Sequence, residues 1–413
     1  MIKTVISADR LFDGTNTATL RQPFVTIADN TIQAVDQAPP PGAEIERFDF
    51  PGCTILPGLI DTHVHLVMAA LETNEAIIAQ VERETDEELV QRALANARSA
   101  LYAGLTTVRD CGGRGRVMQR VRDLIRSGAA EGPDVLACGA PITTSRGHCH
   151  WLGLIADTPD EVRQAAERML HEEADFLKVM ATGGNMTACS DPMKAQYPDE
   201  TLCQIADIGR AAGKHTAAHV LSRAAMPGAV KARMRTIEHC DWRVEEFRYE
   251  FHPELARRMI DQEQYAGLTM AASTRRAFLP EIRASNAPPI RRLDMRFACE
   301  RQMIDFGVRF TLHSDAGVRL TPIDTFALGL RTAVLELRLT PAEAIRAATA
   351  TAAEALSLHD RGIVTPGRRA DLLLVAGDPL ADIACLENVR GVMKGGRWIV
   401  CQNVQTTQAS GVK

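Results

Sequence analysis

The sequence predicts an α/β protein built on a TIM-like (β/α)₈ barrel, with a small β domain assembled from both ends of the chain. Three observations lead to this prediction. Short apolar runs alternate with helical stretches through the middle of the chain, which is typical of βα units and a parallel sheet. Eight such runs can be counted, the number that closes a barrel of this type. Both chain ends instead contain short strands separated by turn signals.

The two chain ends are expected to form one discontinuous domain. Residues 1–56 contain KTVISADRLFDG and FVTIADNTIQAV, in which apolar residues alternate with turn residues. Residues 358–413 repeat this texture in ADLLLVAGDPL and VRGVMKGGRWIV. We therefore expect a small β-sandwich domain formed by 1–56 and 358–413, which the chain completes when it returns from a barrel at 57–357.

The barrel prediction depends on eight candidate strands and on the helices between them. Thr158 with Glu161, and Thr340 with Glu343, have the spacing of a capping box followed by proline, and Gly213 occupies a position typical of a helix C-terminus. The expected strands are Leu59–His65, Thr106–Asp110, Val135–Gly139, Phe176–Met180, Thr216–His219, Thr236–His239, Leu268–Ala271 and Phe310–Ser314.

Composition excludes several classes of protein. The 413 residues are 46% hydrophobic and 24% charged, which is typical of a globular protein with a large core. A net charge of -5 gives no overall attraction to nucleic acid or to an anionic membrane. Ten scattered cysteines without a CxxC pair, and no apolar run of about 18 residues, favour a soluble cytoplasmic protein with reduced thiols. We expect a small-molecule substrate and a homo-oligomer.

Two histidines at the end of the first barrel strand are the first candidate metal ligands. His63 and His65 lie two residues apart in Gly-Leu-Ile-Asp-Thr-His-Val-His. Because side chains along a strand alternate between its faces, both imidazoles are expected to point into the barrel and to share one metal ion. An isolated His-x-His is weak evidence, so the argument depends on further ligands at other strand ends.

Four further candidate ligands occur at the ends of other expected strands, namely Lys178, His219, His239 and Asp315. The carboxyl ends of the strands form the face where barrel enzymes place their active sites. Lys178 lies in an otherwise apolar strand, where an inward lysine is costly unless it is paired or neutralised. It either pairs with an acid or reacts with carbon dioxide to form a carbamate that bridges two cations.

This set of residue types predicts a particular chemistry. Histidines with one or two carboxylates and open positions suit zinc or a similar divalent ion. Two metal ions that share a hydroxide would lower its pKa toward neutrality and polarise a carbonyl group. The terminal Asp315 would accept a proton from the water and pass it to the leaving group.

Several segments, taken in their order along the chain, resemble the metal-ligand motifs of the amidohydrolase superfamily. The chain is most similar to the imidazolonepropionase-like branch, which includes metal-dependent Xaa-Pro dipeptidases and carboxypeptidases. The matching segments are Pro57 to His65, the Lys178 strand followed by Thr182-Gly183-Gly184, His219, Thr236 to His239, and His313 to Gly317. The stretch from Arg361 through Gly377-Asp378-Pro379 resembles the segment that re-enters the small β domain in those enzymes.

The resemblance implies a role for each candidate ligand. His63 and His65 are expected to bind the more buried metal ion, and His219 and His239 the more exposed one. Carboxylated Lys178 would bridge the two ions. Asp315 would be both a metal ligand and the general base.

The resemblance also implies the activity, a metal-dependent hydrolysis of a C–N amide bond in a dipeptide, an N-acyl amino acid or a related small amide. Hydrolysis of a cyclic amide, a carbamate or a lactone, and deamination, remain alternatives. Deamination is disfavoured because His219 is followed by Val-Leu-Ser-Arg-Ala, without the glutamate usual in the mononuclear deaminases. A non-catalytic scaffold of the superfamily is disfavoured because all six metal residues are present.

Substrate contacts are expected from two loops. His148 follows Gly147 after the third strand, where related enzymes place a substrate-contacting histidine, and it could donate a hydrogen bond to the developing oxyanion. Arg275, after the seventh strand, is a candidate for binding a substrate carboxylate through its guanidinium group. Some related dipeptidases bind this carboxylate with a tyrosine two residues after the fifth-strand histidine, but this chain has Leu221 there.

Two residues beside these candidates are expected to support the site. His313, two residues before Asp315, is expected to hydrogen-bond to that carboxylate. Arg109 ends the second strand next to Asp110, and either orients the site or forms a structural ion pair.

Overall fold

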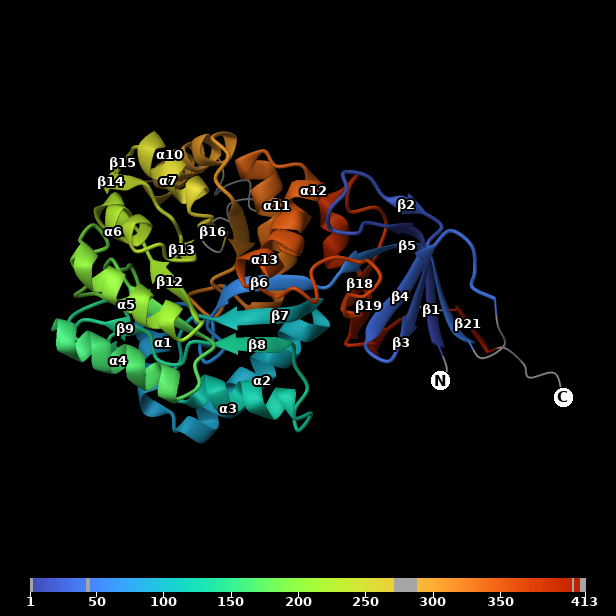
Figure 1. Cartoon of the computed structure of the whole chain (residues 1–413), viewed down its shortest axis with the longest axis horizontal. Helices are drawn as coiled ribbons and strands as arrows, with labels where there is room; N and C mark the ends of the chain where they lie inside the picture. The colour runs from blue at the N-terminus through green and yellow to red at the C-terminus, as the bar shows by residue number, and fades with distance from the viewer. Residues whose placement is uncertain (1–2, 42–44, 271–287, 403–404, 409–413) are drawn as a thin grey trace.

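The computed structural model describes residues 3–41, 45–270, 288–402 and 405–408. Figure 1 shows two parts side by side, a barrel with surrounding helices and a separate sheet at the other end of the molecule. The barrel is formed by the middle of the chain, whereas the separate sheet contains strands from both chain ends.

The eight predicted barrel strands are all present, each within a few residues of its expected bounds. Neighbouring strands pair in parallel within two groups, β6-β7-β8 and β11-β12-β13-β16-β17. The short strand β9 pairs with β11 on the side away from β12. The two groups meet at both junctions: a parallel bridge joins Val64 to Ala316, and the backbone N–H of Asp175, just before β11, donates to the carbonyl oxygen of Ala137 in β8 at 2.8 Å. The strands are β6 (Leu59–Val64), β7 (Leu105–Asp110), β8 (Asp134–Ala137), β11 (Phe176–Met180), β12 (His215–His219), β13 (Thr236–Glu238), β16 (Tyr265–Thr269) and β17 (Phe310–His313).

Helices surround this barrel, and short strands occur in its loops. The helices are α1 (Asn74–Arg83), α2 (Asp86–Tyr102), α3 (Val117–Arg126), α4 (Pro159–His171), α5 (Asp199–Ala211), α6 (Met226–Lys231), α7 (Pro253–Asp261), α10 (Pro288–Asp305), α11 (Phe326–Leu337), α12 (Pro341–Ala347) and α13 (Ala350–Ala355). The elements in the barrel loops are β9 (Ile142–Thr143), β10 (Leu154–Ile155), β14 (Arg243–Glu245), β15 (Arg248–Tyr249), η1 (Arg223–Ala225) and η2 (Ile323–Thr325). A further short helix, η3 (Ile383–Glu387), lies between two strands of the separate sheet.

The predicted helix ends are confirmed. Thr158 and Thr340 each accept a hydrogen bond from the backbone N–H of the glutamate three residues later, and that glutamate bonds back to the cap residue. These reciprocal bonds satisfy backbone groups that the first turn leaves unpaired. Gly213 has φ of 66°, a left-handed conformation that glycine adopts without strain, two residues after α5 ends.

The separate sheet has nine strands and joins both chain ends. The long strand β5 lies parallel to β1 and antiparallel to both β18 and β21, so it connects the N-terminal strands to the C-terminal ones. The strands are β1 (Lys3–Leu11), β2 (Leu20–Arg21), β3 (Phe24–Ala28), β4 (Thr31–Asp36), β5 (Ile45–Pro57), β18 (Leu372–Ala376), β19 (Val389–Lys394), β20 (Arg397–Cys401) and β21 (Gln405–Gln408). The predicted β-sandwich and the boundaries at 56/57 and 357/358 stay predictions.

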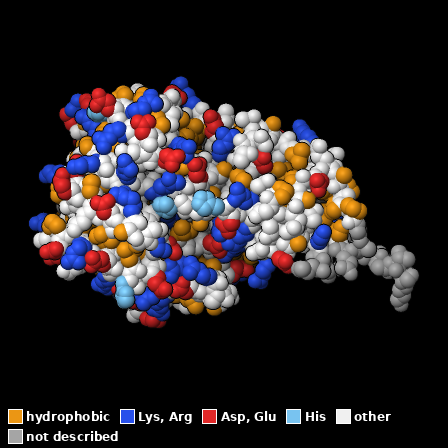
Figure 2. Space-filling view, in the orientation of Figure 1, with side chains coloured by type: hydrophobic (Ala, Val, Ile, Leu, Met, Phe, Trp, Pro, Cys, Tyr) orange, Lys and Arg blue, Asp and Glu red, His pale blue; other side chains and the backbone are white. Residues whose placement is uncertain are grey.

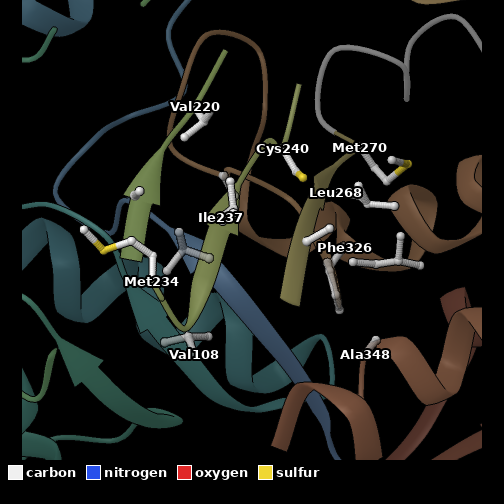
Figure 3. Packing of buried hydrophobic residues seen from close by; sticks show 14 of the residues in the cluster. Val108, Val220, Met234, Ile237, Cys240, Leu268, Met270, Phe326 and Ala348 are labelled. Atoms are coloured by element: carbon white, nitrogen blue, oxygen red, sulfur yellow. The ribbon is translucent and has the colours of Figure 1, made fainter. Parts of the chain in front are cut away.

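Two main hydrophobic clusters stabilise the described parts of the molecule. The larger cluster contains residues of the barrel strands and their helices, and Figure 3 shows Ile237 of β13, Leu268 of β16 and Phe326 of α11 within it. It also extends to one side of the nine-stranded sheet, with Leu373 and Val392. A smaller cluster, including Ile6, Phe50 and Leu374, lies on the nine-stranded sheet. Burial of these apolar side chains is the main force that stabilises each part.

The surface is mixed in charge. On the face drawn in Figure 2, basic and acidic side chains are interspersed across both parts of the molecule. Within the four described ranges, none of the helices is both long enough and apolar enough to cross a membrane.

Candidate active site

The six predicted metal ligands line one cavity. It has a volume of about 700 Å³. Five of the six side chains come from the last residues of strands or from residues just after them, because parallel barrel strands all end on the same face. Lys178 is the exception, in the middle of β11. They are His63, His65, Lys178, His219, His239 and Asp315.

His63, His65 and Asp315 form a group that could hold a cation. The Nε2 atoms of His63 and His65 lie 3.4 and 3.3 Å from the same oxygen, Oδ1 of Asp315. One ligand atom from each of the three residues can be chosen so that all lie within 4.8 Å of one another. Two imidazole nitrogens and a carboxylate oxygen at this spacing are ligands that zinc and similar ions bind.

The other ring nitrogens of these two histidines contact fixed acceptors. His63 Nδ1 lies 3.0 Å from Oε2 of Glu238, and His65 Nδ1 lies 3.2 Å from the carbonyl oxygen of Gly112. A hydrogen bond at Nδ1 sets the tautomer and leaves Nε2 with its lone pair directed into the cavity. Both rings are therefore oriented as metal-binding imidazoles are in proteins.

Glu238 is the site residue that the sequence reasoning missed. It is fully buried and accepts a hydrogen bond of 2.6 Å from NH2 of Arg109, and Thr236 also contacts it. Burial alone favours the neutral carboxyl, but Arg109 and Lys178 lower the pKa of Glu238 to about 2. The sequence feature that could have identified Glu238 is its position in a short predicted strand, directly before the candidate ligand His239.

Arg109 forms a buried ion pair, which was one of its two predicted alternatives, but the acidic partner is Glu238 and not its neighbour Asp110. The other alternative, a role in orienting the site, stays a prediction. The Nε of Arg109 donates to the Thr62 carbonyl oxygen at 2.6 Å, and its NH1 donates to Thr236 at 3.0 Å. Arg109 of β7 is thus hydrogen-bonded to both β6 and β13.

His219 and His239 form the second group at the cavity. Nε2 of His239 lies 3.0 Å from Nδ1 of His219, and Nδ1 of His239 lies 2.6 Å from Oγ1 of Thr269. Burial lowers the pKa of both histidines well below the ordinary value. Both are therefore neutral near pH 7, which is the form that can bind a metal ion.

Lys178 is buried at the same cavity, with 2% of its surface exposed. Its Nζ atom, like Nε2 of His219, has no hydrogen-bond partner among the described residues. A buried ammonium group without a partner is strongly unfavourable. These two orphaned atoms fit a site that is completed by cations and by a change in the charge of Lys178.

The backbone is strained at two of the site residues. His239 and Asp315 have φ of 64° and 57°, in the left-handed region that residues other than glycine seldom adopt. The backbone N–H of Asp315 donates to the His63 carbonyl oxygen at 2.9 Å, and the backbone N–H of the preceding Ser314 donates to Asp61 at 3.2 Å. Strain of this kind is concentrated at functional sites, where surrounding contacts impose it.

His148 lies at the cavity as predicted. Its ring centroid is 4.5 Å from that of His219, and 7% of the residue is exposed. Burial lowers the pKa of His148 to about 3, so its ring is neutral and can donate one hydrogen bond. The backbone of Gly184 approaches so closely that an added Cβ would lie 2.3 Å from the His148 ring, which explains a glycine there.

Two other predicted residues have different outcomes. Arg275 lies outside the described residues. His313 is buried, but its Nε2 lies 3.3 Å from Oγ1 of Thr269 and 3.7 Å from Oε2 of Glu238. The expected hydrogen bond from His313 to Asp315 was therefore wrong, because His313 lies against Thr269 and Glu238, whereas the Asp315 carboxylate lies against His63 and His65.

A comparison with known families agrees with this geometry. Residues 54–399 match the model described as the amidohydrolase family. The chain belongs to the amidohydrolase family. The resemblance noted in the sequence is thus confirmed, and this amidohydrolase is a hydrolase.

Individual relatives of this amidohydrolase cover most of the chain. Ochratoxinase from Aspergillus niger is 27% identical over 375 residues, covering 83% of this chain and 75% of the relative. Imidazolonepropionase from Salinispora arenicola is 26% identical, covering 86% of each. A solved Xaa-Pro dipeptidase with bound methionine is 27% identical and superimposes with a TM-score of 0.83, over 96% of this chain and 100% of that one. The barrel architecture is therefore that of the family.

Proposed function

We propose that this amidohydrolase uses two divalent metal ions, zinc in the first instance, to hydrolyse a C–N amide bond in a dipeptide, an N-acyl amino acid or a related small amide. The observation that carries the proposal is that the six predicted ligands line one cavity, and that two of their buried nitrogen atoms have no hydrogen-bond partner among the described residues. The family membership and the amide-cleaving dipeptidase named among the similar structures support it.

The residues of the chain divide into two ligand groups. His63, His65 and Asp315 would hold one ion, and His219 and His239 the other. Lys178 would serve both after its amine adds to carbon dioxide, with formation of an N–C bond and release of one proton. The resulting carbamate is an anion, which removes the cost of a buried ammonium group and matches two cations.

The reaction would use the protein's own groups for proton transfer and orientation. When bound, the two ions would lower the pKa of a water molecule and polarise the substrate carbonyl group. Asp315 would accept the proton of the attacking water and deliver it to the leaving nitrogen. Neutral His148 would donate a hydrogen bond to the carbonyl oxygen as negative charge develops there.

Metal analysis and kinetics on two variants test this proposal. In Lys178→Ala, we expect the metal content measured by elemental analysis to fall from about two ions per chain to one or fewer. In Asp315→Asn, we expect amide hydrolysis to fall by at least about 100-fold with the fold retained. Lys231→Ala, which removes a lysine with 49% of its side chain exposed, is the matched control. Unchanged metal content in Lys178→Ala, or near-normal turnover in Asp315→Asn, would contradict the proposal.

A further inference from the structure

One wall of the cavity carries two arginines from helix α10. Arg292 and Arg296 both line the cavity together with the predicted metal ligands. They lie four residues apart in a helix, so their side chains leave the same face. A pair of guanidinium groups beside the reaction centre is a feature that amide hydrolysis alone does not require.

Arg296 is already engaged by its surroundings. Its NH2 donates to the carbonyl oxygen of Thr269 at 2.6 Å, and its Nε lies 3.1 Å from Oε1 of Glu300. The guanidinium carbon lies 5.0 Å from the centroid of the Phe297 ring. Thr269 also contacts His239, so Arg296 connects α10 to the end of β16 and is a structural part of the wall.

Arg292 is different, because its guanidinium group has no hydrogen bond or ion pair to any described part of the chain. It is half-buried at the cavity. The nearby Asp241 is buried, and Arg243 and Arg296 also lie close enough to lower the pKa of its carboxyl. Among the described residues, the Arg292 guanidinium is thus not held by a hydrogen bond or ion pair, and Arg292 adds a positive charge to the cavity lining.

The rest of the outer wall is suited to an apolar group attached to an anion. The lining also contains several apolar side chains, and one further arginine, Arg319, which is exposed. Leu221, next to the histidine ligands, has no donor that could bind a carboxylate. The apolar lining side chains are Met180, Met186, Leu221, Leu293, Val318 and Leu320.

We propose that Arg292 binds the free carboxylate of the substrate, and that the enzyme therefore prefers N-acyl amino acids and dipeptides whose carboxylate lies next to the scissile amide. This inference rests on the proposed amide hydrolysis. A guanidinium group binds a carboxylate through two parallel N–H···O bonds, which gives orientation as well as affinity. Arg292 would thus determine which end of the substrate faces the metal ligands.

The test compares a substrate with its uncharged analogue. We would measure kcat/KM of the metal-loaded enzyme for N-acetyl-L-phenylalanine and N-acetyl-L-phenylalaninamide. The wild type should prefer the acid, and Arg292→Met should lower kcat/KM for the acid by about 10- to 100-fold, mainly through KM. The value for the amide should change by less than about 3-fold. Arg292→Lys, which keeps the charge but not the two-pronged geometry, should restore part of the preference.

The matched control is the neighbouring arginine. Arg291 is exposed and stacks 5.4 Å from the Phe247 ring, away from the cavity lining. Arg291→Met should leave both values unchanged. An equal loss for acid and amide in Arg292→Met would overturn the carboxylate assignment, and so would loss of the preference in Arg319→Met instead.

A binding measurement separates this inference from the proposed activity. Calorimetric titration of metal-loaded Asp315→Asn protein with the same two compounds needs no turnover. If the wild type cleaves neither compound but Asp315→Asn binds the acid selectively and loses this on Arg292→Met, the activity is wrong and the carboxylate site stands. If the wild type cleaves both equally well, the activity stands and the carboxylate site is refuted.

Discussion

Glu238 connects a candidate metal ligand to a buried arginine. It contacts Nδ1 of His63 at 3.0 Å and the guanidinium of Arg109 at 2.6 Å, with its own side chain fully buried. It therefore stands between a predicted ligand and a buried cation. Such outer partners hold a ligating imidazole in one orientation and increase its basicity.

Glu238→Gln should weaken metal binding by about 10- to 100-fold, because an amide is a poorer acceptor for His63 and leaves Arg109 without its counter-charge. Competition with a chelator of known affinity measures this. Glu245→Gln, at an exposed glutamate that pairs with Arg248, should bind metal like the wild type. Equal affinities in Glu238→Gln and the wild type would show that Glu238 does not orient the ligand.

Strand β16 has a glycine, Gly267, where the buried Glu238 side chain lies against it. Gly267 lies opposite Glu238 on β13, and an added Cβ would be 2.9 Å from Oε2 of Glu238 and 3.0 Å from Nε2 of His313. The Glu238 carboxylate cannot move aside easily, because Arg109 and His63 both hold it. The glycine is thus required by close approach.

Gly267→Ala should destabilise the protein by about 1–3 kcal/mol through overpacking, and it should weaken metal binding by displacing Glu238. Chemical denaturation and chelator competition measure the two effects. Gly329→Ala, within helix α11, is the matched control, because among the described residues its Cβ would meet only Met270, at an ordinary contact distance of 3.4 Å. A stability of Gly267→Ala equal to that of the wild type would contradict the steric argument.

At the scale of the molecule, one aspartate connects the barrel to the nine-stranded sheet. Asp134 begins β8 and contacts three basic side chains that follow the barrel in the chain, Arg361, Arg369 and Lys394. Nζ of Lys394 lies 2.8 Å from Oδ1 of Asp134. Burial alone would raise the pKa of Asp134, but these cations hold it well below its usual range.

Asp134→Asn should destabilise the protein by about 1–3 kcal/mol at pH 7, since three partly buried cations lose their shared counter-charge. The carboxylate's folded pKa is depressed, so its contribution is present above the unfolded value of about 3.9 and is lost as the pH falls below it.

Unfolding midpoints of variant and wild type should therefore differ at pH 7 and converge in acid. Asp160→Asn, with 87% of its side chain exposed, should match the wild type at both pH values. A difference for Asp134→Asn that persists at low pH would refute the electrostatic explanation.

Local physical chemistry is sufficient for much of what could be predicted. Strand periodicity placed His63 and His65 on one face, and Thr158 and Thr340 cap their helices through contacts three residues apart. The alternation of eight apolar runs with helical stretches predicted the barrel, and the order of the motifs predicted the family. Periodicity, capping and motif order can all be read along a single chain, without knowledge of which distant residues are in contact.

Only the tertiary structure decided which distant residues meet. Glu238 meets Arg109 and His63, from strands far apart in the chain, only when the barrel closes. The pairing order of the nine-stranded sheet, and the position of Arg292 in the cavity lining, likewise depend on how the chain ends and helix α10 pack. Sequence periodicity specifies the face on which a side chain lies, whereas the partner on that face is set by the packing of the whole chain.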